Sequence, residues 1–318
     1  FVKGSVLDYD LFKEQVLKAD VVYHEAAMVG VGQSMYQVSR YTMANVMGTA
    51  YLLDILANEK HNVKKVIVAA SMSSYGEGAY NCEKCGIVNP KLRTEEKMKT
   101  RNWELTCDCG SELKPVPTPE TKPLQPNSIY AITKGKQEEM VLNVCKAYGI
   151  PAVALRYFNV YGPRQSLSNP YTGVAAIFMS RIKNDNAPTV FEDGLQSRDF
   201  VSVHDIANAN ILAMNSNTAD YEVLNVGSGQ QQTIKGVAEV LAKLQGKDIA
   251  PNVTNSYRKG DVRHCFADIS KIKKLLNYSP QVSFEQGMKE LIEWSATQKS
   301  EDKVDAATQE LKDKGLME

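Results

Sequence analysis

Apolar positions along the first half of the chain alternate between strand-like runs and helix-like spacing. Short apolar runs at 21–23, 65–70 and 152–157 are typical of buried strands, whereas 9–19, 41–58 and 129–148 have helical periodicity. Strands joined by helix-length connections favour parallel pairing with right-handed crossovers. The pattern therefore predicts a doubly wound α/β sheet.

Two regions depart from this rhythm. Residues 79–120 are rich in charge, Cys and Pro, and predict an insertion between a strand and the next helix. Beyond residue 165 the elements become shorter and more mixed. We therefore expect a sheet domain over 1–165, a smaller mixed lobe over 166–296, and a charged tail over 297–318 that is either a solvated helix or disordered. The helices expected in the smaller lobe lie near 173–184, 204–214, 234–245 and 284–296.

Charge and composition exclude several classes of protein. Among the 318 residues, Lys plus Arg and Asp plus Glu each number 37, which argues against a nucleic-acid or membrane-surface protein. No apolar run approaches the length of a membrane span, and nothing at the start is typical of a signal peptide. Six cysteines, four of them clustered, suggest metal binding in a reducing compartment. We expect a cytoplasmic protein.

The main candidate for chemistry is Tyr130-Ala131-Ile132-Thr133-Lys134. A spacing of four residues puts Tyr130 and Lys134 on one helix face, where the ammonium is expected to lower the phenol pKa and make Tyr130 a base. Ser71 follows the apolar run 65–70, at the strand end where α/β ligands bind, and is expected to hydrogen-bond a substrate hydroxyl beside the phenolate.

These motifs, together with His24-Glu25-Ala26-Ala27 and Arg156-Tyr157-Phe158-Asn159, resemble the NAD-dependent epimerase/dehydratase family of extended short-chain dehydrogenases. The resemblance runs from Gly4 to about Trp294. It implies a Rossmann-like NAD-binding domain in which Ser71, Tyr130 and Lys134 are catalytic. The cofactor contacts that it implies are Ser5, Val6, Ala26, Ala27, Asn45, Tyr130, Lys134 and Tyr157. Ser5 stands where the family usually has Asp.

The resemblance also implies a nucleotide-diphosphate sugar as substrate, with the lobe over 166–296 mainly substrate-binding. Its contacts are expected at Ser71, Asn159, Arg198, Arg258 and Asp261. An arginine suits a diphosphate because its guanidinium donates two charge-assisted hydrogen bonds in parallel.

Two positions after Ser71 bear on the reaction. Family dehydratases carry an Asp-Glu pair there, whereas this chain has Met72 and Ser73, which do no acid–base work. A 4-epimerase needs only the Ser, Tyr and Lys, NAD, and room for the keto sugar to turn. The resemblance favours a bacterial subgroup of dTDP-L-rhamnose or UDP-glucose 4-epimerase type. The alternatives are a keto-sugar reductase or dehydratase of the same family, or a non-catalytic binding protein stapled by zinc.

The clustered cysteines form two short motifs, Cys82-x-x-Cys85-Gly86 and Cys107-x-Cys109-Gly110. Four thiolates suit tetrahedral zinc, and a small insertion without a large core needs a bound metal ion to stabilise it. Free thiols of a degenerate ribbon are the alternative.

The chain contains no Gly-x-x-Gly-x-x-Gly turn, which in the family lies on the first strand–helix connection. We therefore expect an amino-terminally truncated sequence that lacks the first βαβ unit, and the choice between NAD and NADP stays open. The resemblance further implies a homodimer.

Overall fold

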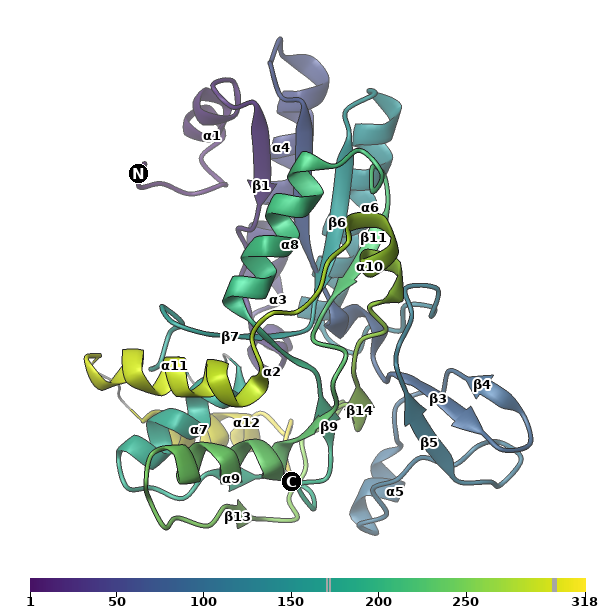
Figure 1. Cartoon of the computed structure of the whole chain (residues 1–318), viewed down its shortest axis with the longest axis vertical. Helices are drawn as coiled ribbons and strands as arrows, with labels where there is room; N and C mark the ends of the chain where they lie inside the picture. The colour runs from purple at the N-terminus through teal and green to yellow at the C-terminus, as the bar shows by residue number, and fades with distance from the viewer. Residues whose placement is uncertain (170, 172, 299–301) are drawn as a thin grey trace.

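The computed structural model describes residues 1–169, 171, 173–298 and 302–318. At its centre lies a parallel sheet of four strands in the order β1-β2-β6-β11 (Figure 1). The strands are β1 (Val21–His24), β2 (Lys65–Ser71), β6 (Ala152–Tyr157) and β11 (Val223–Val226). The predicted doubly wound α/β fold is confirmed.

Helices cover both faces of this sheet, which explains why its strands are apolar throughout. On β2, Val66 and Val68 pack toward one face and Ile67 toward the other, and all three are fully buried. The first face is covered by α1 (Tyr9–Val16), α4 (Gly48–Asn58) and α6 (Ile129–Ala147), and the second by α8 (Val203–Asn215) and α10 (Ser270–Leu276).

A second lobe lies beyond the carboxyl ends of the strands (Figure 1). Its separate core is formed by α7 (Val174–Lys183), α9 (Ile234–Leu244) and α11 (Phe284–Ala296). Its strands are β7 (Asn159–Tyr161), β8 (Thr189–Val190), β9 (Ser197–Arg198), β10 (Phe200–Ser202), β12 (Gln232–Thr233), β13 (Asn252–Val253) and β14 (His264–Cys265). Because α8, β11 and α10 return to the sheet, the two lobes interleave along the chain.

The insertion forms a small unit that projects from the body (Figure 1). It consists of β3 (Ala79–Cys82), β4 (Gly86–Val88), α5 (Glu95–Lys99) and β5 (Leu113–Val116), with the three strands paired antiparallel in the order β4-β3-β5. Its core is a cluster of four buried side chains, Tyr80, Cys82, Leu105 and Leu113, and Met98 and Trp103 pack apart from it against Tyr257. So small a core supplies little stability of its own.

The helix expected over 41–58 begins earlier than expected, at Val38, and is interrupted by a π-helical stretch. It comprises α3 (Val38–Tyr41), a π-helical stretch η1 (Thr42–Met47) and α4, and it follows the short helix α2 (Val31–Ser34). A π-helical stretch inside a helix often marks a functional site. None of the helices in the described part of the chain has an apolar stretch that could span a bilayer.

The charged tail differs from the expectation of a wholly solvated or disordered segment. It contains α12 (Val304–Asp313), in which Ala307 and Leu311 are buried. Leu311 lies over Gly32 at the start of α2, and the Glu310 carboxylate accepts a 2.7 Å hydrogen bond from the Tyr171 hydroxyl. The helix α12 therefore packs on the body of the protein through a small number of apolar side chains. Part of the predicted tail, 299–301, lies outside the described residues.

Candidate active site and metal site

Ser71 and Tyr130 come together from two different elements. Ser71 ends β2 and caps the short 3₁₀ helix η2 (Met72–Tyr75), and its hydroxyl accepts a 3.2 Å hydrogen bond from the Ser73 amide. Tyr130 lies in the first turn of α6, which is capped by Ser128. The Tyr130 amide donates a 3.0 Å hydrogen bond to the buried Ser34 hydroxyl. These bonds fix where each chain segment enters the site.

The protonation of Tyr130 differs from the sequence expectation. Burial raises the pKa of its phenol, and a hydrogen bond with Ser71 acts in the opposite direction without cancelling the effect. The expected lowering by Lys134 is wrong for this structure. The reason is that the Lys134 ammonium is turned toward Gln137, to which it donates a 2.8 Å hydrogen bond.

Lys134 belongs to a buried polar chain beneath the site. Gln137 accepts from Lys134 and donates a 2.9 Å hydrogen bond to the Thr49 hydroxyl, which also lies 2.8 Å from the ring of His24. Burial lowers the pKa of Lys134 to about 8, although the charge of Glu25 raises it. Burial likewise lowers the pKa of His24 to about 4, and Lys134 adds to the effect. The His24 ring is therefore neutral at pH 7 and adds no second positive charge near the ammonium.

The turn after β1 is held by Asn45, which lies in the π-helical stretch η1. The Asn45 amide accepts a 2.7 Å bond from the Met28 amide and donates to the Met28 carbonyl and the Thr133 hydroxyl. Asn45 is fully buried, and it fixes the Ala26–Ala27 turn against α6. Its role is thus to position this turn.

The other expected cofactor residues lie apart from one another. The Tyr157 hydroxyl donates a 2.9 Å bond to Glu25 and accepts a 2.7 Å bond from Asn210, next to the turn. Ser5 is exposed and Val6 packs on Gly48 in the segment before α1. Among the described residues, no hydrogen bond joins Ser5 or Val6 to that turn.

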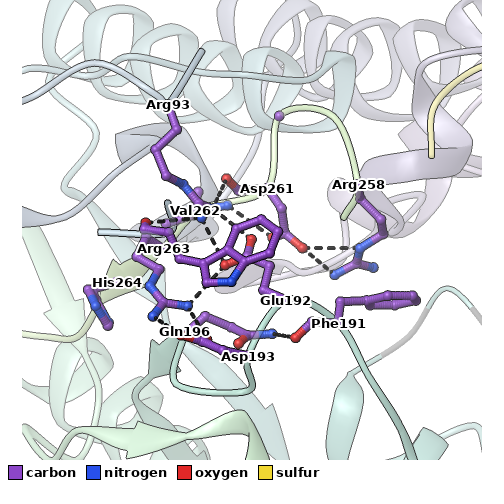
Figure 2. A network of polar contacts seen from close by, with 12 residues as sticks. Arg93, Phe191, Glu192, Asp193, Gln196, Arg258, Asp261, Val262, Arg263 and His264 are labelled. Carbon is purple, nitrogen blue, oxygen red and sulfur yellow. Dashed lines mark hydrogen bonds and ion pairs between the residues drawn. The ribbon is translucent and has the colours of Figure 1, made fainter. Parts of the chain in front are cut away.

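The expected substrate arginines are brought together by one carboxylate. One carboxylate oxygen of Asp261 accepts a 3.2 Å bond from Arg198. The other accepts a 2.7 Å bond from Arg258 (Figure 2). Burial alone would raise the pKa of Asp261, but Arg258 and Arg198 lower it to about 2. Arg258 also lies over the Phe191 ring at 5.0 Å. The three residues thus form one cationic cluster in the second lobe.

Asn159 lies on β7, directly after the strand that pairs with the Ser71 strand. Ser71 is in register with Tyr157, two residues before Asn159. The amide oxygen of Asn159 is buried and has no hydrogen-bond partner among the described residues. A buried polar atom without a partner is costly, so this side chain fits a site that a polar ligand completes.

The four clustered cysteines converge at the tip of the insertion. Their sulfur atoms all lie within 4.8 Å of one another, and those of Cys82 and Cys109 are 3.5 Å apart. Four sulfurs around a tetrahedral zinc ion are about 3.8 Å apart, given a zinc–sulfur bond of about 2.3 Å. Gly86 and Gly110, each directly after a cysteine, have φ of 73° and 85° with open space around them, so the turns need glycine for backbone conformation alone. The shorter spacing of the second pair is therefore compatible with convergence.

Comparison with known proteins decides the family. The family model described as NAD dependent epimerase/dehydratase family matches residues 1–96, and the one described as GDP-mannose 4,6 dehydratase matches 110–291, more than half of the chain. The chain belongs to the NAD-dependent epimerase/dehydratase family. It is 34% identical over 277 residues to a dTDP-L-rhamnose 4-epimerase of Burkholderia thailandensis, covering 87% of this chain and 75% of the relative.

Solved structures of family members have the same fold. A UDP-glucose 4-epimerase from Thermotoga maritima, solved with UDP-glucose, has 31% identity and a TM-score of 0.77, covering 93% of this chain and 84% of that one. A UDP-glucuronic acid 4-epimerase from Bacillus cereus, solved with UDP-glucuronic acid and NAD, has 29% identity and a TM-score of 0.72, with coverage of 92% and 80%.

Sequence reasoning missed the residues that hold the catalytic candidates. Gln137 lies one turn after Lys134 on the same helix face, so helical spacing alone could have suggested it. The Ser73 hydroxyl donates a 2.9 Å bond to Ser71. From the sequence, Ser73 was noted only as the replacement of an acidic residue of the dehydratases. No sequence signal indicated Thr49, which reaches Gln137 from another helix.

Proposed function

We propose that this protein is a nucleotide-sugar 4-epimerase that oxidises the sugar transiently at C4 with bound NAD. The observation that carries the proposal is the pairing of Ser71 with Tyr130 above the buried ammonium of Lys134. The family relationship supports the same chemistry. Substrates of dTDP-L-rhamnose or UDP-glucose type are favoured by the relatives named above.

The residues present fit the nicotinamide end of NAD. Lys134 has three N–H donors and uses one on Gln137, and its charge interacts with Glu25, which directly precedes the small-residue turn of Ala26 and Ala27. NAD, when bound, supplies the acceptor and donor of the hydride. Tyr130 and Lys134 would hold it together with this turn.

Tyr130 is the proton-transfer group in this proposal. Its phenolate takes the proton of the C4 hydroxyl during oxidation and returns a proton when the hydride comes back on the other face of the sugar. The Ser71 hydroxyl, itself oriented by Ser73, donates to the same sugar oxygen. Arg198, Arg258 and Asn159 bind the diphosphate.

Epimerisation is favoured over dehydration by what surrounds Ser71. An elimination needs an acid and a base next to the sugar. Met72 and Ser73 follow Ser71 directly, and the nearby buried Glu77 is engaged by the amides of Arg263 and His264. The arrangement therefore supports oxidation and reduction at one carbon without loss of water.

A panel of UDP- and dTDP-sugars with less than one equivalent of NAD⁺ tests the proposal. We expect many turnovers per NAD⁺ and a change of configuration at C4 by NMR. Consumption of stoichiometric NADH would indicate the reductase alternative and contradict an epimerase. The non-catalytic alternative predicts no conversion of any sugar.

We propose that Cys82, Cys85, Cys107 and Cys109 bind a structural zinc ion. The support is the convergence of their sulfur atoms and the small core of the insertion. We expect one zinc per chain by mass spectrometry of the metal, and its loss in Cys107→Ser/Cys109→Ser. Cys145→Ala, which changes a buried cysteine of the main core, serves as the control and keeps the zinc. A wild-type protein without zinc contradicts the site.

We propose that a second copy of the chain covers the exposed apolar face of α3, η1 and α6. Val38, Met43, Met47 and Ile132 are each 39–46% exposed, and Met43 borders a shallow hollow of about 660 Å³. Two adjacent helices from each copy would bury this face symmetrically. Light scattering should show a dimer, and Met43→Glu/Ile132→Glu should convert it to a monomer. The control Ile211→Glu, at an exposed position of α8, should stay a dimer. A monomeric wild type would contradict the dimer.

We place the protein in the cytoplasm. All six cysteines, each within the described residues, are free thiols, as expected in a reducing compartment. Fractionation of cells with a tagged protein tests this, and recovery outside the cytoplasmic fraction would contradict it.

A further inference from the structure

We propose that the cysteine-rich insertion is a positioning device for the nucleotide-diphosphate site, acting through Arg93, Glu104 and Tyr80. This inference rests on the proposed function, because it assumes that Arg198 and Arg258 bind a diphosphate. What it adds is a role for the insertion, whose side chains lie outside the catalytic centre.

The first contact is made by Arg93, at the edge of the insertion. Its guanidinium donates two parallel 2.8 Å hydrogen bonds to Glu192 and one of 3.1 Å to the Asp261 carbonyl (Figure 2). Arg93 and Glu192 are both buried. Since the Asp261 carboxylate holds Arg198 and Arg258, Arg93 fixes the backbone of the residue that orients both of them.

The second contact is made by Glu104. Its carboxylate accepts a 2.9 Å bond from Arg263 and lies 3.2 Å from the ring of His264. Arg263 is fully buried, and its carbonyl accepts a 3.1 Å bond from Arg198. Glu192 and Asp193 also accept hydrogen bonds from Arg263. Glu104 is therefore the contribution of the insertion to a set of three carboxylates that holds Arg263 and, with it, Arg198.

The third contact runs through β3. The Tyr80 hydroxyl donates a 3.0 Å bond to Glu77, and the same carboxylate accepts the amides of Arg263 at 2.8 Å and His264 at 3.3 Å. Tyr80 is also part of the insertion core. The loop between Arg258 and His264 is thus held by the insertion at its middle and at its end.

The cysteine cluster lies close to these contacts along the chain. Glu104 directly precedes a hairpin that runs from Leu105 to Leu113. The turn of this hairpin carries Cys107 and Cys109. Cys82 follows Tyr80 on β3. A metal ion that joins the two segments would hold Tyr80 and Glu104 in a fixed relation, so metal occupancy is coupled to the arginine cluster.

The alternative is that the insertion only stabilises the fold. A merely structural role lowers the melting temperature and leaves the affinity of the folded protein unchanged. The positioning role instead predicts weaker binding of the nucleotide diphosphate at unchanged turnover, because Tyr130 and Lys134 lie in the other lobe.

Binding of UDP and dTDP by calorimetry, with the KM and kcat of the sugar substrate, separates the two. We expect Glu104→Gln to weaken nucleotide binding and raise KM by roughly tenfold, with kcat within twofold, because a charged partner of buried Arg263 is lost. Tyr80→Phe, which keeps the insertion core, should shift both values in the same direction. Glu112→Gln, an exposed position on the same hairpin, is the matched control and should match the wild type.

Two results would overturn the inference. If wild-type protein binds and converts its substrate while Glu104→Gln equals Glu112→Gln in dissociation constant and KM, the positioning role is wrong and the proposed function stands. If the wild type binds neither UDP nor dTDP, the proposed function fails and this inference fails with it. Removal of metal by a chelator should weaken nucleotide binding as Glu104→Gln does.

Discussion

The ammonium of Lys134 donates a 2.8 Å hydrogen bond to the side-chain oxygen of Gln137, one turn further along the same helix. Gln137 is fully buried and is itself held by Thr49. The position of the ammonium is therefore set by a neutral side chain, and burial lowers the pKa of the lysine to about 8. The catalytic activity should depend on Gln137 although it does not reach the substrate.

Gln137→Glu should move the alkaline limb of the pH–rate profile to higher pH. A carboxylate beside the ammonium favours the charged lysine, whereas the wild-type lysine loses its proton above about pH 8. The profile of kcat/KM between pH 6 and 11 measures this shift. Glu139→Gln, which removes an exposed carboxylate from the same helix, should leave the limb in place. An unchanged profile in Gln137→Glu would argue against a role for the Lys134 charge.

Tyr130→Phe should lower kcat by roughly a hundred- to ten-thousandfold, the usual contribution of a proton-transfer group. Binding of UDP or dTDP should stay within twofold, because the arginine cluster belongs to the other lobe. Tyr148→Phe, at the exposed end of the same helix, controls for loss of a phenol. Retention of full activity by Tyr130→Phe is incompatible with the proposed mechanism.

Arg258→Ala should raise KM for the nucleotide sugar by at least about tenfold, because a charge-assisted contact to the diphosphate is lost. The effect on kcat should be small. Lys259→Ala removes the same charge one residue further along and should leave KM unchanged. Equal KM values for the two variants would remove Arg258 from the substrate site.

Acid should destabilise the protein through His24. The folded-state pKa is about 4 and the ordinary value is 6.5, so the unfolded chain binds the proton first. Stability is therefore lost as pH falls from 6.5 to 4, by about 3 kcal/mol. Urea unfolding across this range measures the slope, which His24→Asn should flatten. His204→Asn, at an exposed ring, should keep the wild-type slope.

The sheet and most helices followed from sequence because their apolar periodicity is strong. The strand expected at 152–157 is found as predicted, since buried parallel strands are continuous apolar runs. The π-helical stretch around Asn45 could not be predicted, because it depends on contacts with Met28 and Thr133. In the same way, docking of α12 depends on Leu311 meeting Gly32, far away in sequence.

The sequence predicted which residues form the candidate site, but it did not predict the direction of the pKa shift of Tyr130. The motifs located Ser71, Tyr130 and Lys134, but spacing on a helix does not say which way a long side chain turns. Lys134 turns to Gln137, and burial then raises the phenol pKa. The attachment of the insertion to Arg263 could not be predicted from the sequence either, because Glu104 and Arg263 are 159 positions apart.

Conversion of the sugar in D₂O tests the central claim most directly. Hydride removed from C4 and returned to C4 carries no solvent hydrogen, so NMR should show a 4-epimer with protium at every sugar carbon and NAD⁺ unchanged at the end. Elimination instead exchanges a carbon-bound hydrogen with solvent. Deuterium at a sugar carbon, or no interconversion at C4 across the UDP- and dTDP-sugars, would contradict the account.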